Sequence, residues 1–213
     1  IGMYGIGMKR AIFKIGLEAI VESSSKDGVR EVIYDREWMD YASENADHNW
    51  DLKIDRRKPK KTKGVTIVVG ALKNDVARQF KNSAYIEEIK RKIGRHFGYL
   101  ILRGFRIKVN KQVIQPDTLR LYTAQGKKDA INPFDYEAEV NGVKVRVTVG
   151  FHRSVPPPEE IEDEEEASRT REESGISVIC NDRVILHNDT TFRTGWGTRG
   201  VPKFHNQFMA IGG

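Results

Sequence analysis

The chain has 213 residues, of which 38% are hydrophobic and 31% are charged, so it can bury one large core or two small ones. Its 36 Lys and Arg residues outnumber its 30 Asp and Glu residues, and the net charge of +6 permits an anionic partner without requiring one. The single Cys180 excludes an internal disulfide framework, and no apolar run approaches the roughly 20 residues that span a bilayer. We therefore expect a globular protein without a membrane partner, cytoplasmic or, in a eukaryote, nuclear.

A glycine-rich segment opens the chain and leads into a predicted helix. Three glycines and then Lys9 fall within the first nine residues. Over residues 8–20, apolar side chains recur at helical spacing, which predicts a helix there. A loop that enters a helix presents backbone N–H groups, and the helix N-terminus adds positive potential, so the segment suits a phosphate. Lys9 is then either a phosphate ligand or a solvated lysine of the first turn.

Strands and a basic stretch follow. Residues 28–35 are predicted to form a strand, and the β-branched run at residues 64–73 is typical of a buried strand. Seven of the eleven residues from Lys53 to Lys63 are basic, and Pro59 among them favours a loop. This stretch either contacts nucleic-acid phosphates or is a solvated surface loop. It has no interleaved aromatic residues on which bases could stack.

The strongest predicted helix covers residues 82–102, with Ser83 as its N-cap and Gly94 and Gly98 within it. Three hairpins are predicted beyond it, with turns at Asn110–Lys111, Asn141–Gly142 and Asn181–Asp182. A polar stretch between the first two hairpins predicts a boundary that separates residues 1–118 from residues 119–213. The sequence therefore predicts two α/β units of the α+β kind.

Three common phosphate motifs do not fit the opening segment. A P-loop requires Lys and then Ser or Thr where this chain has Met8 and Lys9. A dinucleotide fingerprint would end at Arg10, where Gly or Ala is required. A kinase glycine loop lies between two strands, whereas a helix is predicted here. The pattern that does fit is G-x-x-G-x-G-x-K, which runs from Gly2 to Lys9 and continues into the helix.

This segment resembles the ATP lid of the GHKL ATPases, the superfamily of gyrase B subunits, heat-shock chaperone ATPases, histidine kinases and MutL proteins. MORC-like and bacterial stand-alone members look most similar. Residues 64–73 are similar to the strand that backs the adenine pocket, and residues 175–209 resemble the transducer domain. The resemblance implies a partial two-layer GHKL sandwich at residues 1–118 and a transducer-like domain at residues 119–213, with an acidic loop at residues 155–174.

The resemblance assigns roles to individual residues. The lid residues that would hold the ATP phosphates are Gly2, Tyr4, Gly5, Ile6, Gly7, Met8 and Lys9. Val65 stands where the adenine-side strand usually has Thr, so either Thr66 makes the polar contact or that contact is absent. Lys203 follows a glycine-rich turn and is either the catalytic lysine that reaches the γ-phosphate or an ordinary loop lysine.

The resemblance also implies groups that this chain does not supply. In the superfamily, a Glu that acts as general base and an Asn that holds Mg²⁺ precede the lid, and an Asp-x-Gly loop recognises adenine. We expect these elements upstream or in another polypeptide, because the chain begins at the lid. Residues 44–49 contain a Glu and an Asn but are predicted to be a solvated loop. The histidines are scattered, so no metal site is predicted within the chain.

The implied function is a conformational switch. ATP with Mg²⁺ would order the lid, lid closure would favour a homodimer, and hydrolysis would reset a clamp on nucleic acid or a protein client. The chain alone is expected to bind ATP weakly or not at all. The alternative is a non-catalytic module that binds nucleic acid or protein and retains a degenerate nucleotide site.

Overall fold

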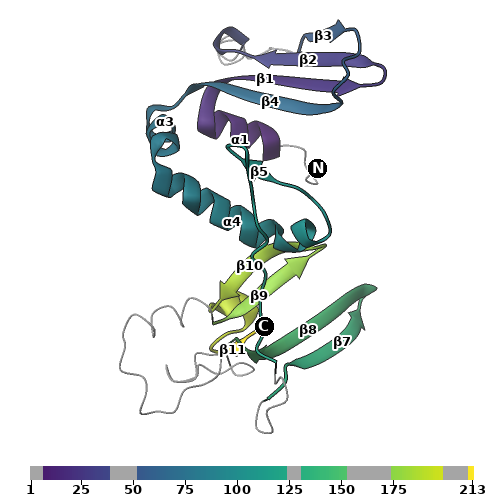
Figure 1. Cartoon of the computed structure of the whole chain (residues 1–213), viewed down its shortest axis with the longest axis vertical. Coiled ribbons are helices and arrows are strands. Elements are labelled where there is room, and N and C mark those ends of the chain that lie inside the picture. The colour runs from purple at the N-terminus through teal and green to yellow at the C-terminus, as the bar shows by residue number, and fades with distance from the viewer. Residues whose placement is uncertain (1–6, 39–51, 124–130, 153–173, 199–210) are drawn as a thin grey trace. The chain divides into compact units, whose positions relative to one another are not determined.

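The computed structural model describes residues 7–38, 52–123, 131–152, 174–198 and 211–213. The chain divides into two compact units, residues 1–86 and residues 87–213, and we describe each by itself. Antiparallel sheets and a few helices make the chain a mixed α/β protein, in agreement with the predicted α+β class (Figure 1). The boundary predicted after residue 118 lies inside the second unit, because residues 115–118 pass close to Gly94 and Gly98.

The first unit contains helix α1 (Gly7–Ile15) and a four-stranded antiparallel sheet with strand order β3-β2-β1-β4. Its strands are β1 (Gly16–Ser25), β2 (Gly28–Tyr34), β3 (Ile54–Arg57) and β4 (Gly64–Leu72). Helix α1 lies along one face of this sheet (Figure 1). The strands at residues 28–35 and 64–73 are confirmed, whereas β3 lies within the basic stretch that was predicted to be a loop.

The helix predicted over residues 8–20 ends five residues early, at Ile15, and β1 follows without a connecting loop. Gly16 pairs with Leu72 of β4, and a Cβ atom at Gly16 would lie 2.3 Å from the carbonyl oxygen of Gly70. Strand pairing therefore overrides the local helical pattern, because the backbone groups of residues 16–20 are used by the β1–β4 ladder.

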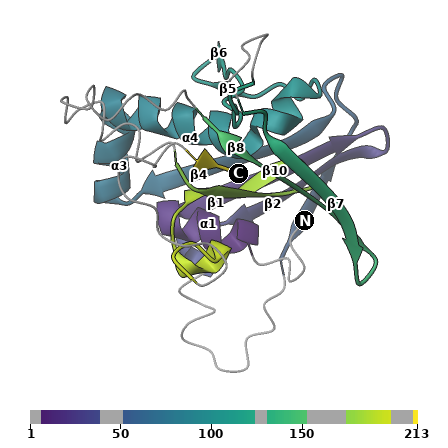
Figure 2. The same cartoon turned by 90° about the horizontal axis from the view of Figure 1, so that it is seen from below.

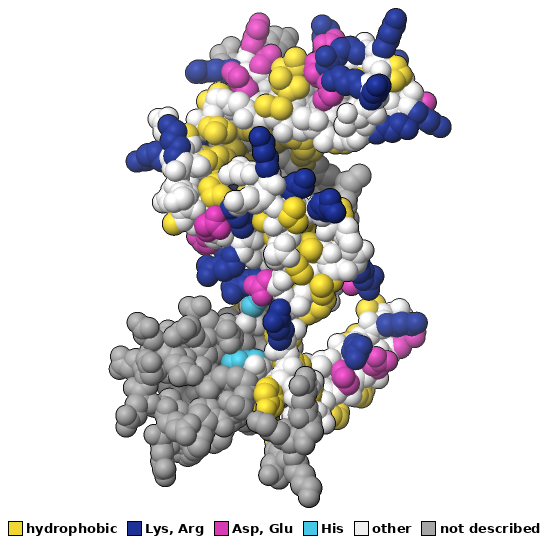
Figure 3. All heavy atoms as spheres, viewed as in Figure 1, with side chains coloured by type: hydrophobic (Ala, Val, Ile, Leu, Met, Phe, Trp, Pro, Cys, Tyr) yellow, Lys and Arg dark blue, Asp and Glu magenta, His cyan; other side chains and the backbone are white. Residues whose placement is uncertain are grey.

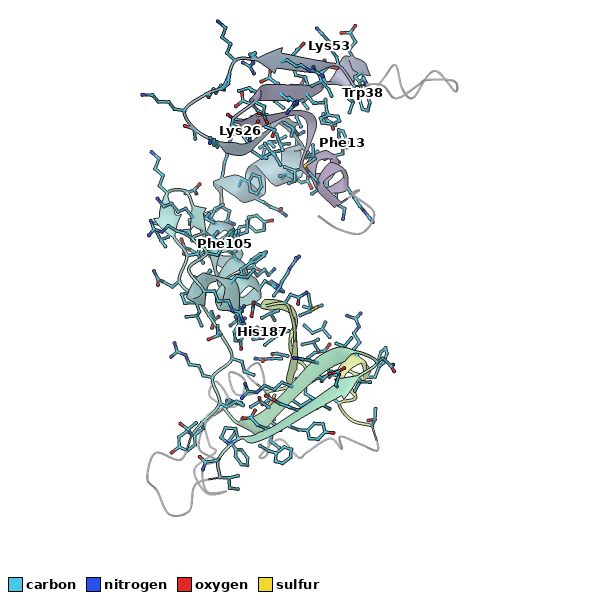
Figure 4. All side chains as sticks on the ribbon, turned by 90° about the vertical axis from the view of Figure 1, so that its right-hand side faces the viewer. Phe13, Lys26, Trp38, Lys53, Phe105 and His187 are labelled. Atoms are coloured by element: carbon cyan, nitrogen blue, oxygen red, sulfur yellow. The ribbon has the colours of Figure 1, made fainter. Side chains whose placement is uncertain are left out.

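The core of the first unit lies between α1 and one face of the sheet. Ile12 is 4% exposed and packs with Ala19 and Tyr34. Tyr34 makes edge-to-face contacts with Phe13 and Trp38, with ring centroids 6.1 and 5.7 Å away (Figure 4). We call the side of the sheet that packs on these residues the helix face and the other side the open face.

Strand pairing assigns each sheet residue to one of these faces. Ala19 pairs with Val69 of β4 and with Tyr34 of β2, so these three share the helix face. Because successive side chains of a strand point to opposite faces, Val65 belongs to the helix face and Thr66 to the open face. Strand β4 is exposed over most of its length in this unit, so the prediction that residues 64–73 form a buried strand is wrong.

Two helices follow β4, α3 (Asn74–Lys81) and α4 (Ser83–Leu102). The long helix is confirmed, but its cap is one residue earlier than predicted, because the side-chain oxygen of Asn82 accepts a hydrogen bond from the Ala84 N–H at 3.0 Å. Gly94 and Gly98 are buried where residues 115–118 pass close to the helix. The Asp117 N–H donates to the Gly94 carbonyl at 3.1 Å.

The three predicted hairpins are all present in the second unit (Figures 1 and 2). They are formed by β5 (Lys108–Val109) with β6 (Gln112–Val113), β7 (Phe134–Val140) with β8 (Val143–Phe151), and β9 (Ile176–Cys180) with β10 (Arg183–Asp189). Both residues of each turn have positive φ, as tight hairpin turns require. A short strand, β11 (Ile211–Gly212), pairs with β8, and a 3-10 turn covers Phe192–Thr194.

Candidate nucleotide-binding site

The N-terminal turn of α1 is the described part of the predicted phosphate site. Gly7 and Met8 begin the helix and are exposed, and a Cβ atom at Gly7 would meet no atom of the described residues within 4 Å. The first turn contains no acidic residue, while the exposed Arg10 adds positive charge near the positive end of the helix dipole. The space and the charge at this helix end fit an anionic group, and the apolar side of α1 remains buried in the core.

Most of the other predicted site residues lie outside the described residues. These are Gly2, Tyr4, Gly5 and Ile6 of the lid and the candidate catalytic Lys203. Lys9 is part of α1, but the position of its side chain is not described. The acidic loop at residues 155–174 is also outside the described residues, except for Ser174.

Thr66 does not share a face with α1. It pairs with Glu22 of β1 on the open face, whereas its neighbour Val65 lies on the helix face. Whether Thr66 makes the polar contact or that contact is absent stays a prediction; the structure decides only that Thr66 lies on the open face. Strand register is the deciding factor, because a one-residue step along a strand reverses the direction of the side chain.

A row of acidic residues crosses the open face beside Thr66. Glu22, Glu31 and Asp55 occupy paired positions on β1, β2 and β3. Arg57 contacts both glutamates, with a distance of 3.2 Å to Glu22, and Lys60 donates to Glu22 at 2.6 Å. Lys53 lies 3.5 Å from Asp55 (Figure 4). Three of the seven basic residues of the stretch from Lys53 to Lys63 are therefore neutralised within the sheet, which the sequence pattern did not reveal.

These contacts lower the pKa of Glu22. The hydrogen bond from Lys60 is the largest cause. Burial, the next largest, raises the pKa, and the positive charges of Lys60 and then Arg57 lower it further. A carboxyl whose pKa is lower in the folded state contributes stability above its ordinary pKa of 4.5. That contribution is lost as the pH falls through the folded-state value.

We predict that Glu22→Gln lowers the melting temperature at pH 7, because it removes the charge that Lys60 and Arg57 share. The difference from the wild type should shrink as the pH falls below 4.5, where the wild-type carboxyl also becomes neutral. Thermal unfolding at several pH values measures this. Glu18→Gln, on the same face of β1 and in no ion pair among the described residues, is the control. Equal effects of both variants at pH 7 would contradict the prediction.

Two histidines that look unrelated in the sequence come together in the second unit. His152 and His187 line a cavity of about 340 Å³ together with Arg95, Asp117 and Arg120. Burial is the main cause that lowers the pKa of His187, and the charge of Arg95 adds to it while Asp117 opposes it (Figure 4). His187 is therefore neutral near pH 7 and can both donate and accept a hydrogen bond there. Only the tertiary structure brings these residues together, since Arg95 lies in α4, His152 follows β8 and His187 lies in β10.

No metal site emerges from the part of the chain that the structure describes. Among those residues, no group of three His, Cys, Asp or Glu side chains lies close enough to hold an ion. The described helices are also too short or too polar to cross a membrane.

Comparison with known proteins adds no assignment. No family model, curated protein or solved structure matches the chain.

Proposed function

We propose that the chain is part of a GHKL-type ATPase that acts as a conformational switch. The observation that carries this proposal is the position of α1, which begins at Gly7 directly after the glycine-rich segment. Its first turn is exposed, basic and free of acidic residues, while Ile12 fixes the helix to the sheet. A helix end held in this way suits the phosphates of a nucleotide.

In this proposal, the residues of the chain bind and orient the triphosphate. The backbone N–H groups of the segment from Gly2 to Met8 contact the phosphates, and Lys9 neutralises part of their charge. Lys203 reaches the γ-phosphate and stabilises the charge that develops there. ATP supplies the phosphoanhydride bond, and the general base and the Mg²⁺ ligands are contributed from outside the chain. Ordering of the lid favours a homodimer that grips nucleic acid or a protein client.

Val65 supports a second candidate function, that of a non-catalytic binding module. It places an apolar side chain at the helix-face position where the resembled superfamily has Thr. A nucleotide site that lacks this polar contact discriminates adenine less well. The two candidates differ in turnover, because only the switch hydrolyses ATP.

We expect ATP with Mg²⁺ to raise the melting temperature of the full-length protein, and Gly7→Val to weaken ATP binding at least tenfold, about 1.4 kcal/mol. The added side chain would occupy the space above the first turn of α1. Calorimetric titration measures the affinity. Thr66→Val is the matched control, because Thr66 lies on the open face and should leave ATP affinity unchanged.

Three experimental outcomes would each contradict a different part of the proposal. Unchanged ATP affinity of Gly7→Val would show that this segment is not the lid. A full-length protein that binds ATP without hydrolysing it would favour the binding module. If the full-length protein shows no thermal shift and no turnover with ATP, the nucleotide proposal as a whole is wrong.

A further inference from the structure

The opposite faces of the first sheet carry opposite patterns of charge. On the open face, the acidic row of Glu22, Glu31 and Asp55 has basic partners. On the helix face, the adjacent row places Arg30 of β2 directly opposite Arg56 of β3. Both arginines are exposed, and neither forms an ion pair with any residue that the structure describes. The sheet thus holds two like charges side by side, with no acidic partner for either among the described residues.

Like charges directly opposite each other on neighbouring strands destabilise a sheet. Arg30 and Arg56 occupy such positions beyond the part of the helix face that α1 covers, since their row contains Ser23 and the exposed Val65 rather than core residues. An arginine pair that forms no ion pair with the described residues is well placed to bind an external anion. Two planar guanidinium groups on adjacent strands match the oxygens of phosphate groups better than two flexible ammonium groups would.

Four further exposed lysines lie in the loops at the same end of the sheet, where Ser25 pairs with Gly28, Val29 with Arg57 and Ser24 with Gly64. Lys26 lies in the β1–β2 turn, and Lys58, Lys61 and Lys63 lie between β3 and β4. None of these four forms an ion pair with a described residue. Figure 3 shows Lys and Arg side chains projecting from the strands of this unit. We call the set Lys26, Arg30, Arg56, Lys58, Lys61 and Lys63 the basic row.

We propose that the basic row binds the phosphate backbone of duplex nucleic acid without reading its sequence. Several positive charges gathered at one end of a sheet fit a polymer with regularly spaced phosphates. The large apolar residues exposed on the helix face near the row are aliphatic, namely Ile54, Val65 and Ile67. Because these described residues offer no aromatic ring for stacking, they favour a duplex, whose bases are already stacked, over a single strand. This inference is independent of the nucleotide proposal.

The test compares two double variants of the full chain that lose the same charge. Arg30→Gln with Arg56→Gln removes the uncompensated pair, while Lys53→Gln with Lys60→Gln removes two cations that already have acidic partners. Binding to a short labelled DNA duplex is measured by fluorescence anisotropy between about 50 and 200 mM salt. The arginine variant should lose affinity about tenfold or more, and the slope of log K against log salt should become shallower by about 2. The lysine variant should change the affinity less than threefold.

The melting temperature provides a second readout. If Arg30 and Arg56 had a structural role, replacing them would lower the melting temperature. The single variants Arg30→Gln and Arg56→Gln should leave the melting temperature unchanged or raise it, because each removes a like-charge repulsion. Equal losses of affinity in the two double variants would overturn the proposal, since net charge alone would explain them. Single-stranded DNA or polyglutamate that binds as tightly as the duplex at equal charge would overturn it as well.

Discussion

Replacement of Gly16 by Ala should destabilise the first unit by about 3 kcal/mol, at the upper end of the usual cost of overpacking. The added Cβ atom would lie 2.3 Å from the carbonyl oxygen of Gly70 and 2.8 Å from Cγ1 of Val69. A backbone carbonyl cannot rotate away as the end of a side chain can, so β1 and β4 would have to separate at this point. The free energy of unfolding from urea titration, with hydrogen exchange of β1 and β4 amides to localise the change, measures this.

Gly7→Ala is the control for this prediction. Gly7 is the first residue of α1, and its added Cβ atom would meet no described atom within 4 Å. Since Ala is a better helix former than Gly, this variant should be neutral or slightly stabilising, by less than about 1 kcal/mol. Gly16→Ala with wild-type stability would show that the direct passage from α1 into β1 does not require a glycine.

Gly175→Ala should be the most damaging single substitution in the second unit. Gly175 has φ +122°, a conformation that costs an L-residue about 1–3 kcal/mol. Its new Cβ atom would also lie 2.5 Å from the carbonyl carbon of Asn188, which adds an overpacking cost of similar size. Gly175 donates to the Ile211 carbonyl at 3.1 Å and accepts from the Gly213 N–H at 3.0 Å. We therefore expect β11 to lose its pairing, with faster hydrogen exchange there and a lower free energy of unfolding.

Gly104→Ala separates the cost of backbone strain from the cost of overpacking. Gly104 has φ +97°, but its added Cβ atom would meet no atom within 4 Å. It should therefore show only the backbone strain, so that its loss of stability is clearly smaller than that of Gly175→Ala. If the two variants lose the same free energy of unfolding, the contact between the added Cβ atom and Asn188 does not contribute to the loss of stability.

The candidate site could be anticipated from the sequence only in part. The start of α1 directly after the glycine-rich segment was expected, because glycine spacing and helical periodicity are visible in a short window. The face of the sheet on which the Thr66 side chain lies was not expected, since it depends on which residue of β1 lies opposite Thr66. The compensation of Arg57 and Lys60 by Glu22 was hidden for the same reason, because these contacts join residues 35 and 38 positions apart.

By itself, the sequence determined the elements whose signals are local. The three hairpin turns follow from pairs of residues that tolerate positive φ, and α4 follows from its periodic apolar residues. Only the tertiary structure decided that α1 ends at Ile15, that β3 forms within the basic stretch, and that Arg30 faces Arg56. These features depend on strand pairing, in which the energy of a residue is determined by a partner that the neighbouring sequence does not specify.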